Sequence, residues 1–404
     1  MSRTIFKNAN VFNGLDVLGE ADVVVEDERI VAVITRPETV KENPDDTVYD
    51  INGKTLMPGM VAGHGHFSLN DIDLRQPAGP DLKYTAAYMS VIAAKSAEDT
   101  LQAGFTTYVG AGSIHNIDVE LQSLIADGFV NGPRIVPCSR DFVPTGHTVD
   151  YKPEFWNSPK TMNSLGAVCD SPAEFRKEIR RDAKRGARII KLYPEGGHGL
   201  GYSPRLSREE IDVAIETAKL ADLKVRGHVF SKPVIKACLD AGMDIIDHGD
   251  HFDAELADLA VEKGAYVLPS LYFAKAAVGV YHGPDDVKRW YDYARESLAI
   301  GIEKGVKYVT GDDFGLVELP HGDNAKEVAL YVEELGVPAE EALKWATHNG
   351  AEMSGIPDIG QIAEGKLADL LIIDGNPIKN IGVITQADKI HLVMKNGVIA
   401  KSVL

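Results

Sequence analysis

The feature that most constrains this chain is an alternation of short β-branched apolar runs with longer amphipathic stretches, from about residue 58 to about residue 361. This alternation is typical of strand–helix units whose strands lie parallel in one sheet. The helical stretch at 207–222 opens with the capping-box pair Ser207 and Glu210. Eight such units predict a (β/α)8 barrel. We predict its strands at Leu56–His66, Phe105–Gly110, Arg134–Cys138, Ala187–Tyr193, Leu223–Val229, Asp244–His248, Ala265–Pro269 and Val306–Asp313.

Both ends of the chain are rich in strand signals and poor in helical ones. About the first 55 residues carry short apolar runs broken by Asn, Gly and Asp. About the last 40 residues do the same, and Asn396-Gly397 between apolar runs predicts a hairpin. Neither end has enough strands for a stable sheet, and chain termini commonly lie close together. We therefore predict a composite β-sandwich domain from residues 1–57 and 362–404, beside a barrel domain at 58–361.

The charge balance narrows the choice of partners. Lys and Arg number 42 against 60 Asp and Glu, a net charge of -18. A surface of that sign repels nucleic acid phosphates and anionic lipids, so we expect neither as a partner. We find no signal peptide and no long apolar run, and expect a cytoplasmic protein. The three cysteines, Cys138, Cys169 and Cys238, have no paired spacing and are expected to be reduced and structural.

Metal-ligating residue types stand where the predicted strands end. Barrel enzymes carry their chemistry at the carboxyl ends of the strands. His64 and His66 end the first strand, and a spacing of two puts both imidazoles on one face. His228 and His248 end the fifth and sixth strands, and Gly311-Asp312-Asp313 ends the eighth. Each residue alone has a structural alternative, but the whole set at the correct ends predicts a metal site.

Lys191 is the most informative single residue. It lies within the apolar run Ala-Arg-Ile-Ile-Lys-Leu-Tyr, where an uncompensated ammonium would be costly. A lysine held near two metals can react with carbon dioxide to form a carbamate, whose oxygens suit such cations. The alternatives are a lysine that reaches the barrel mouth or one that pairs with an acid.

These residues resemble the amidohydrolase superfamily, and most closely its prolidase-like and imidazolonepropionase-like branch. The likeness covers nearly the whole chain. The opening motif matches Pro58-Gly59-Met60 through His64 and His66, and the strand-four lysine matches Lys191 followed by Gly196-Gly197. The strand-five and strand-six histidines match His228 and His248-Gly249, and Gly311-Asp312-Asp313-Phe314-Gly315 matches the strand-eight motif. The tail GQIAEGKLADLLIIDGNP resembles the segment by which that family returns to its β-sandwich.

The resemblance implies a hydrolase of carbon–nitrogen bonds with two divalent metals, for which we expect zinc, and an N6-carboxylated Lys191. It implies metal ligation by His64, His66, Lys191, His228, His248 and Asp313, with Asp313 rather than Asp312 as the aspartate ligand. A metal-bridging hydroxide would attack an amide, such as an N-acyl amino acid, dipeptide or aryl amide, and Asp313 would shuttle the proton. The partner is then a small-molecule substrate. Relatives of this kind are often homo-oligomers.

The chain departs from the family pattern at three places. Ala62 stands where the family usually has an aspartate two residues before the first motif histidine, which puts in doubt the surroundings of His64. Thr145-Gly146-His147 is one glycine short of the family motif. His228 is followed by Val229-Phe230 where related enzymes often carry a tyrosine, so substrate preference is not carried over.

Three residues are candidates for substrate contacts. His147 is a candidate donor to the substrate oxygen, or else an ordinary loop histidine. Tyr272 would form an aromatic wall, which favours an apolar or aromatic group in the substrate, or would merely pack its loop. Arg226 could bind a substrate carboxylate, although a buried ion pair is the commoner role for such an arginine. The long segment from Ser139 to Asp170 carries several aromatic residues and is predicted to form a lid.

Two other functions fit the sequence less well. A mononuclear deaminase or cyclic-amide hydrolase of the same fold would lack Lys191 and would carry a glutamate after the strand-five histidine, where this chain has Ser231, Lys232 and Pro233. A non-catalytic assembly protein of the same fold would have lost ligands that are all present here.

Overall fold

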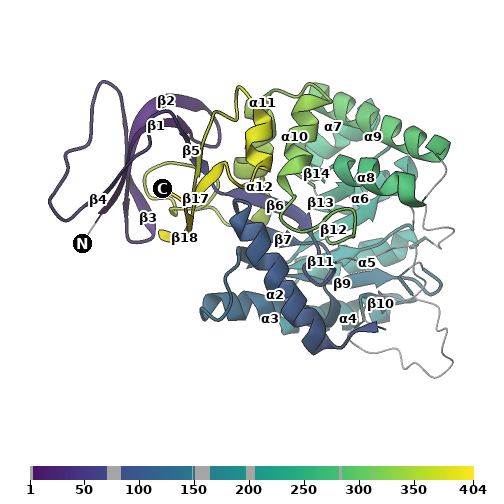
Figure 1. Ribbon diagram of the computed structural model, residues 1–404. Helices are drawn as coiled ribbons and strands as arrows, with labels where there is room; N and C mark the ends of the chain where they lie inside the picture. Colours follow the sequence, from purple (N-terminus) through teal and green to yellow (C-terminus); the bar gives the residue numbers. More distant parts are fainter. Residues whose placement is uncertain are drawn as a thin grey trace.

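The computed structural model describes residues 3–70, 83–147, 149–150, 164–196, 205–281, 284–311 and 313–404. Strands from both ends of the sequence, purple and yellow in Figure 1, lie together on one side of the molecule, and the parallel strands with their helices lie on the other. Within the described ranges, no helix is both long enough and apolar enough to cross a membrane.

Both chain ends contribute strands to one eight-stranded sheet, with β4 beside β1 and the order β18-β17-β16-β5-β1-β2-β3. The link between the ends is antiparallel pairing of β5 with β16, which sets Leu56 opposite Ile372. The predicted hairpin is present, because β17 pairs with β18 around Asn396-Gly397, both with positive φ. A two-layer sandwich and the domain limits stay predictions. The strands are β1 Arg3–Phe12, β2 Val17–Glu26, β3 Arg29–Thr35, β4 Thr47–Asp50, β5 Thr55–Pro58, β16 Leu370–Ile373, β17 Ile390–Lys395 and β18 Val398–Ser402.

The middle of the chain forms parallel sheets of seven and three strands, with the orders β10-β9-β11-β12-β13-β14-β15 and β6-β7-β8. A strand is found within each of the eight predicted ranges, but the eighth shortens from Val306–Asp313 to the two residues of β15, β10 was not predicted, and two other strands are divided. The first divides at Gly59 into β5 of the terminal sheet and β6, and the third divides at Pro137 into β8 and β9. The strands are β6 Met60–Gly65, β7 Phe105–Gly110, β8 Arg134–Val136, β9 Cys138–Val143, β10 Gly166–Val168, β11 Ile189–Leu192, β12 Lys224–Val229, β13 Ile245–His248, β14 Tyr266–Leu268 and β15 Lys307–Tyr308.

Helices follow the strands along the chain. The predicted capping box of α5 is present, because the Ser207 side chain accepts from Glu210 N and the Glu210 side chain accepts from Ser207 N. The helices are α2 Ala86–Gln102, η1 Ile114–Asn116, α3 Ile117–Ala126, α4 Pro172–Arg185, α5 Arg208–Lys219, α6 Lys232–Ala241, α7 Ala254–Lys263, α8 Leu271–Tyr281, α9 Pro284–Lys304, α10 Ala325–Glu333, α11 Ala339–Lys344, η2 Trp345–Asn349, α12 Gly350–Ser354 and η3 Ile381–Thr385.

One apolar cluster gathers side chains from nearly all the parallel strands. It includes Val61, Val109, Val136, Ile189, Ile245, Leu268 and Val309. The first and last parts of the parallel set also meet, since Gly65 pairs with Phe314 and Asp313 N donates to His64 O at 2.8 Å. This arrangement is a TIM-barrel-type α/β fold. Strands around one core bring their carboxyl ends to one rim, which is what positions the site.

Asp369 joins the terminal sheet to the parallel strands. Its carboxylate accepts from Arg134 Nη1 of β8 at 2.7 Å and from Asn396 N of the β17–β18 turn at 2.8 Å. The side chain of Asp369 is 1% exposed, so these contacts are shielded from water.

Replacing Asp369 with alanine leaves a guanidinium and a backbone amide without their acceptor, and we expect unfolding free energy to fall by about 3 kcal/mol. Urea denaturation measures the change. The matched control is Asp358→Ala, which removes an exposed ion pair with Arg29 and should cost less than about 1 kcal/mol. Equal losses in the two variants would contradict the role given to Asp369.

Candidate metal centre

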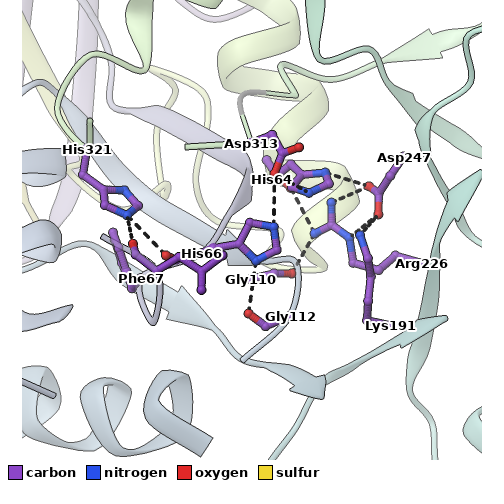
Figure 2. Close-up of polar contacts among 12 residues, drawn as sticks. His64, His66, Phe67, Gly110, Gly112, Lys191, Arg226, Asp247, Asp313 and His321 are labelled. Carbon is purple, nitrogen blue, oxygen red and sulfur yellow. Dashed lines mark hydrogen bonds and ion pairs between the residues drawn. The ribbon is translucent and has the colours of Figure 1, made fainter. Parts of the chain in front are cut away.

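A group of buried polar side chains lies one layer above the apolar cluster, toward the carboxyl ends of the strands. Side chains two residues apart on a strand share a face. Ile189 and Ile245 belong to the apolar cluster, and Lys191 and Asp247 follow each of them by two positions. Arg226 and His228 have the same spacing on β12. The side chains of Lys191, Arg226, His228 and Asp247 are buried, and Figure 2 shows how three of them converge.

His64, His66 and Asp313 form a compact group of donors. One ligand atom from each lies within 4.8 Å of the others. Oδ1 of Asp313 lies 3.4 Å from Nε2 of His64 and 3.2 Å from Nε2 of His66. His66 Nδ1 lies 3.3 Å from the carbonyl oxygen of Gly112, so the Nε2 side of the ring faces the group. The first strand and the end of the eighth thus supply three metal-binding atoms at one point.

A row of rings extends from this group toward the fifth strand. The His64 and His248 ring centroids are 5.3 Å apart, and those of His248 and His228 are 4.5 Å apart. Tyr193 stacks on His228 at 4.2 Å with an interplanar angle of 10°. All four predicted imidazole ligands therefore lie in one contiguous row.

Two of the predicted ligands have unusual backbone conformations. His248 has φ 70° and Asp313 has φ 53°, in the left-handed region. This region costs a residue other than glycine roughly 1–2 kcal/mol, and such costs concentrate at functional sites. His248 is the last residue of β13, and Asp313 lies in the segment that follows β15.

Lys191 is buried at the centre, and its ammonium has a partner. Nζ of Lys191 donates to Oδ2 of Asp247 at 2.6 Å and lies 5.5 Å from the centroid of the Tyr193 ring. The sequence argument assumed an uncompensated charge, whereas Asp247 compensates it. The burial of Lys191 therefore does not by itself require a carbamate. The predicted carboxylation is supported by the position of Lys191 beside the predicted metal ligands.

Arg226 faces inward and is fully buried. Its Nε and Nη2 donate to Asp247 at 3.0 and 2.5 Å, and its Nη1 donates to the carbonyl oxygens of Gly63 and Gly110 at 3.2 and 2.7 Å. The structure thus shows Arg226 in a buried ion pair, which is the commoner of the two roles considered for it from sequence. With these contacts made, Arg226 is not among the residues that we propose to contact a substrate.

The pKa shifts differ among the three residues of this group. Burial lowers the pKa of His64 to about 4, so its imidazole is neutral at pH 7. For His66, burial acts downward, but Asp313 outweighs it and the pKa is raised. Burial would raise the pKa of Asp313, yet His64, His66 and Lys191 hold it well below its usual range. Asp313 is therefore ionised, and its negative charge favours a cation beside it.

The predicted substrate contacts are distributed around this rim. His147 is buried, its ring meets Tyr193 edge-on at 5.1 Å, and burial lowers its pKa to about 4. Tyr272, at the start of α8, stacks parallel to Phe314 at 6.2 Å. Residues 148 and 151–163 of the predicted lid lie outside the described residues, its beginning belongs to strand β9 (Cys138–Val143), and Gly166–Val168 near its end forms strand β10.

Sequence reasoning missed Asp247, Tyr193, Phe314 and His321. Asp247 could have been found, since a buried Arg226 needs an acid and Asp247 lies on the neighbouring strand β13. Asp247 also bears on the doubt raised by Ala62, because its Oδ1 lies 3.2 Å from Nδ1 of His64. His321 holds the turn after the first strand through Nε2 contacts of 3.2 and 3.0 Å to the carbonyl oxygens of His66 and Leu69. No sequence signal pointed to His321.

The donor set fits a divalent metal. Two neutral-capable imidazoles and one carboxylate are the ligand types of zinc and similar ions. A group of buried ligands, two of them in left-handed backbone, is also costly to assemble without a function. The residues that would hold a second ion, His228 and His248, are adjacent.

Comparison with known proteins identifies the family. The chain matches the amidohydrolase family over residues 55–400, and it belongs to that family. Ochratoxinase from Aspergillus niger is 26% identical over 95% of this chain and 83% of that protein. Imidazolonepropionase from Streptomyces coelicolor is 23% identical over 89% of this chain and 87% of that protein. A crystal structure of a prolidase complexed with N-methylphosphonate-L-proline has a TM-score of 0.86 and 29% identity, and covers 99% of this chain and 100% of its own.

The predicted branch of the family is confirmed by these relatives, as is the class of enzyme. The chain is a hydrolase that acts on carbon–nitrogen bonds.

Asp118, a buried carboxylate of α3, gives a test of the electrostatics near this site. Its Oδ2 accepts from Cys138 N at 3.3 Å, and burial raises its pKa from 3.8 to about 7. The unfolded chain loses this proton near pH 4, but the folded chain keeps it to about pH 7. The stability supplied by the neutral acid is therefore present below pH 4 and is lost as the pH rises to 7.

Asp118→Asn keeps the shape and removes the ionisation. We expect the metal-stripped variant to gain about 2–4 kcal/mol of unfolding free energy relative to the wild type between pH 4 and pH 8. Denaturant titrations at the two pH values measure it. A difference between the two proteins that does not change with pH would contradict the raised pKa.

Proposed function

We propose that this protein is a binuclear metal-dependent hydrolase that cleaves an amide bond of a small molecule, such as a dipeptide, an N-acyl amino acid or an aryl amide. The observation that carries the proposal is the convergence of His64, His66 and Asp313 within 4.8 Å at the rim of the barrel, beside the rings of His248 and His228. The relatives support the substrate class, since ochratoxinase and prolidase are named for such activities.

The ligands divide into two groups. His64, His66 and Asp313 would hold one ion, and His228 and His248 the other, with carboxylated Lys191 shared between them. We propose zinc, because imidazole and carboxylate ligands suit it. Two such ions would supply an activated water and polarise the substrate carbonyl.

The chain itself moves the proton. Asp313 is ionised, and its Oδ1 faces the ligand group, so it can accept a proton from the attacking water and return it to the leaving amine. His147 lies across Tyr193 from the histidine row, where we propose that it contacts the substrate oxygen.

Carboxylation of Lys191 requires the neutral amine. Its nitrogen adds to the carbon of carbon dioxide, a proton leaves the nitrogen, and the product is an anionic carbamate. This change replaces an ammonium by two oxygen ligands in a site that already holds four imidazoles.

The aromatic surface beside Asp313 bears on the substrate. Tyr272 stacks on Phe314, the residue after Asp313, and Glu327 of α10 fixes this turn by accepting from the backbone amides of Leu271 and Tyr272. We therefore propose that an apolar or aromatic group of the substrate packs against Tyr272.

The proposed function is tested by comparing zinc-reconstituted and chelator-stripped protein on a library of dipeptides, N-acyl amino acids, aryl amides, lactams and esters. Zinc-dependent cleavage of an amide class, read by mass spectrometry, is the expected result. One tightly bound ion per chain that persists in Lys191→Ala would favour a mononuclear deaminase or cyclic-amide hydrolase instead.

Asp313→Asn keeps the size of the side chain but cannot take up the proton, and we expect kcat to fall by about 100- to 10,000-fold. Zinc content is measured in parallel, because Asp313 is also a ligand. Asp323→Asn, which alters a surface ion pair in the same segment, should retain activity. Full activity of the Asp313 variant would refute its assigned role.

Tyr272→Ala removes the aromatic surface, and we expect KM for substrates with an aromatic group to rise about tenfold while KM for alanyl analogues is unchanged. Tyr272→Phe is the matched control and should behave as the wild type. Equal changes for both substrate classes would mean that Tyr272 only packs its loop.

A further inference from the structure

One carboxylate contacts side chains from two of the strands that supply metal ligands. Asp247 is the next-to-last residue of β13 and is 0% exposed. Its Oδ1 lies 3.2 Å from Nδ1 of His64, and its Oδ2 accepts from Nζ of Lys191 at 2.6 Å. Figure 2 shows His64 and Lys191 reaching Asp247 from different directions.

Arg226 holds this carboxylate in place. It donates to both oxygens of Asp247, and its remaining terminal nitrogen donates to backbone carbonyl oxygens of β6 and β7. A planar guanidinium with contacts on both of its edges has little freedom to rotate. Arg226 therefore fixes Asp247 relative to Gly63, the residue before His64.

The contact with Asp247 determines which nitrogen of His64 is available. An imidazole that ligates a metal is neutral and carries one proton, on the nitrogen that does not face the metal. A carboxylate beside Nδ1 favours the proton there, which leaves the lone pair on Nε2. Nε2 is the nitrogen that faces Asp313, at 3.4 Å.

We propose that Asp247, held by Arg226, is a positioning residue that sets the tautomer and orientation of His64 and the location of Lys191, so that the metal site is formed before the metal arrives. The inference rests on the proposed function. It also assigns a carboxylate partner to His64 in a chain that has Ala62 where the family resemblance leads us to expect an aspartate.

A second buried arginine–aspartate pair provides a matched control. Arg140 of β9 donates to Asp182 of α4 from Nη2 at 2.9 Å and from Nε at 3.1 and 3.2 Å, and both side chains are buried. Asp182 also accepts from Arg140 N, and Glu178 is the other acid on this arginine. This pair has similar burial and geometry and involves none of the proposed ligands.

The experiment compares Asp247→Asn with Asp182→Asn in the full chain. Each metal-stripped protein is checked for folding by circular dichroism, and zinc affinity is measured by competition with a chromophoric chelator. We expect Asp247→Asn to bind zinc about 10- to 100-fold more weakly, because outer partners of ligating histidines have effects of this size. Asp182→Asn should lose stability and keep its zinc affinity.

Activity provides a second readout. The kcat/KM of Asp247→Asn should recover in part when excess zinc is added, whereas a loss caused only by altered packing would not respond to zinc. Should Asp247→Asn fail to fold, Arg226→Lys is used in its place. Lysine keeps the positive charge but cannot donate to Asp247 and to the backbone carbonyl oxygens from two edges of one planar group. The same direction of change in zinc affinity is expected.

Wild-type zinc affinity in Asp247→Asn, or an equal loss of affinity in Asp182→Asn, would overturn the positioning role. Failure of the proposed function is distinguishable, because then the wild-type protein itself would bind no zinc and cleave no amide.

Discussion

The centre of this molecule depends on the contacts made by one carboxylate, that of Asp247. It accepts from Arg226 and Lys191 and lies against His64, all within an interior closed to water. Burial alone would raise its pKa, but Arg226 and Lys191 outweigh burial and hold the pKa well below its usual range. Removing one member of such a network would leave a buried charge uncompensated, which typically costs several kcal/mol.

The fold determines which residues can join this network. An apolar layer fills the lower interior, and alternation along each strand then places polar side chains two positions higher. The parallel strands end at one rim, so residues far apart in sequence, such as His64 and Asp313, meet there. The terminal sheet leads into the parallel strands at Gly59, between β5 and β6, and its Asp369 carboxylate contacts Arg134 of β8.

Much of this could be predicted from sequence because the signals are local. Alternating apolar runs located the eight strands, and an Asn-Gly pair located the hairpin of β17 and β18. The spacing of His64 and His66 identified one face of a strand, and that face does carry adjacent imidazoles. The division of the first strand at Gly59 was not visible, since it depends on pairing with β16 at the far end of the chain.

What sequence could not supply is the pairing of charges. Lys191 and Arg226 were each recognised as buried cations, yet their shared partner is set by the neighbouring strand β13. Asp247 stands directly before His248, whose φ of 70° lies in the left-handed region rather than in that of a strand. Sequence alone does not locate this conformation, although His, Asp and Asn adopt it more often than most residues do.

The most direct test of a two-metal centre built on Lys191 is a crystal structure of the zinc-reconstituted protein with anomalous diffraction. Our account predicts two ions, one on His64, His66 and Asp313 and one on His228 and His248, with density for a carbamate on Lys191 between them. A single ion, with the Lys191 ammonium still on Asp247, would contradict it.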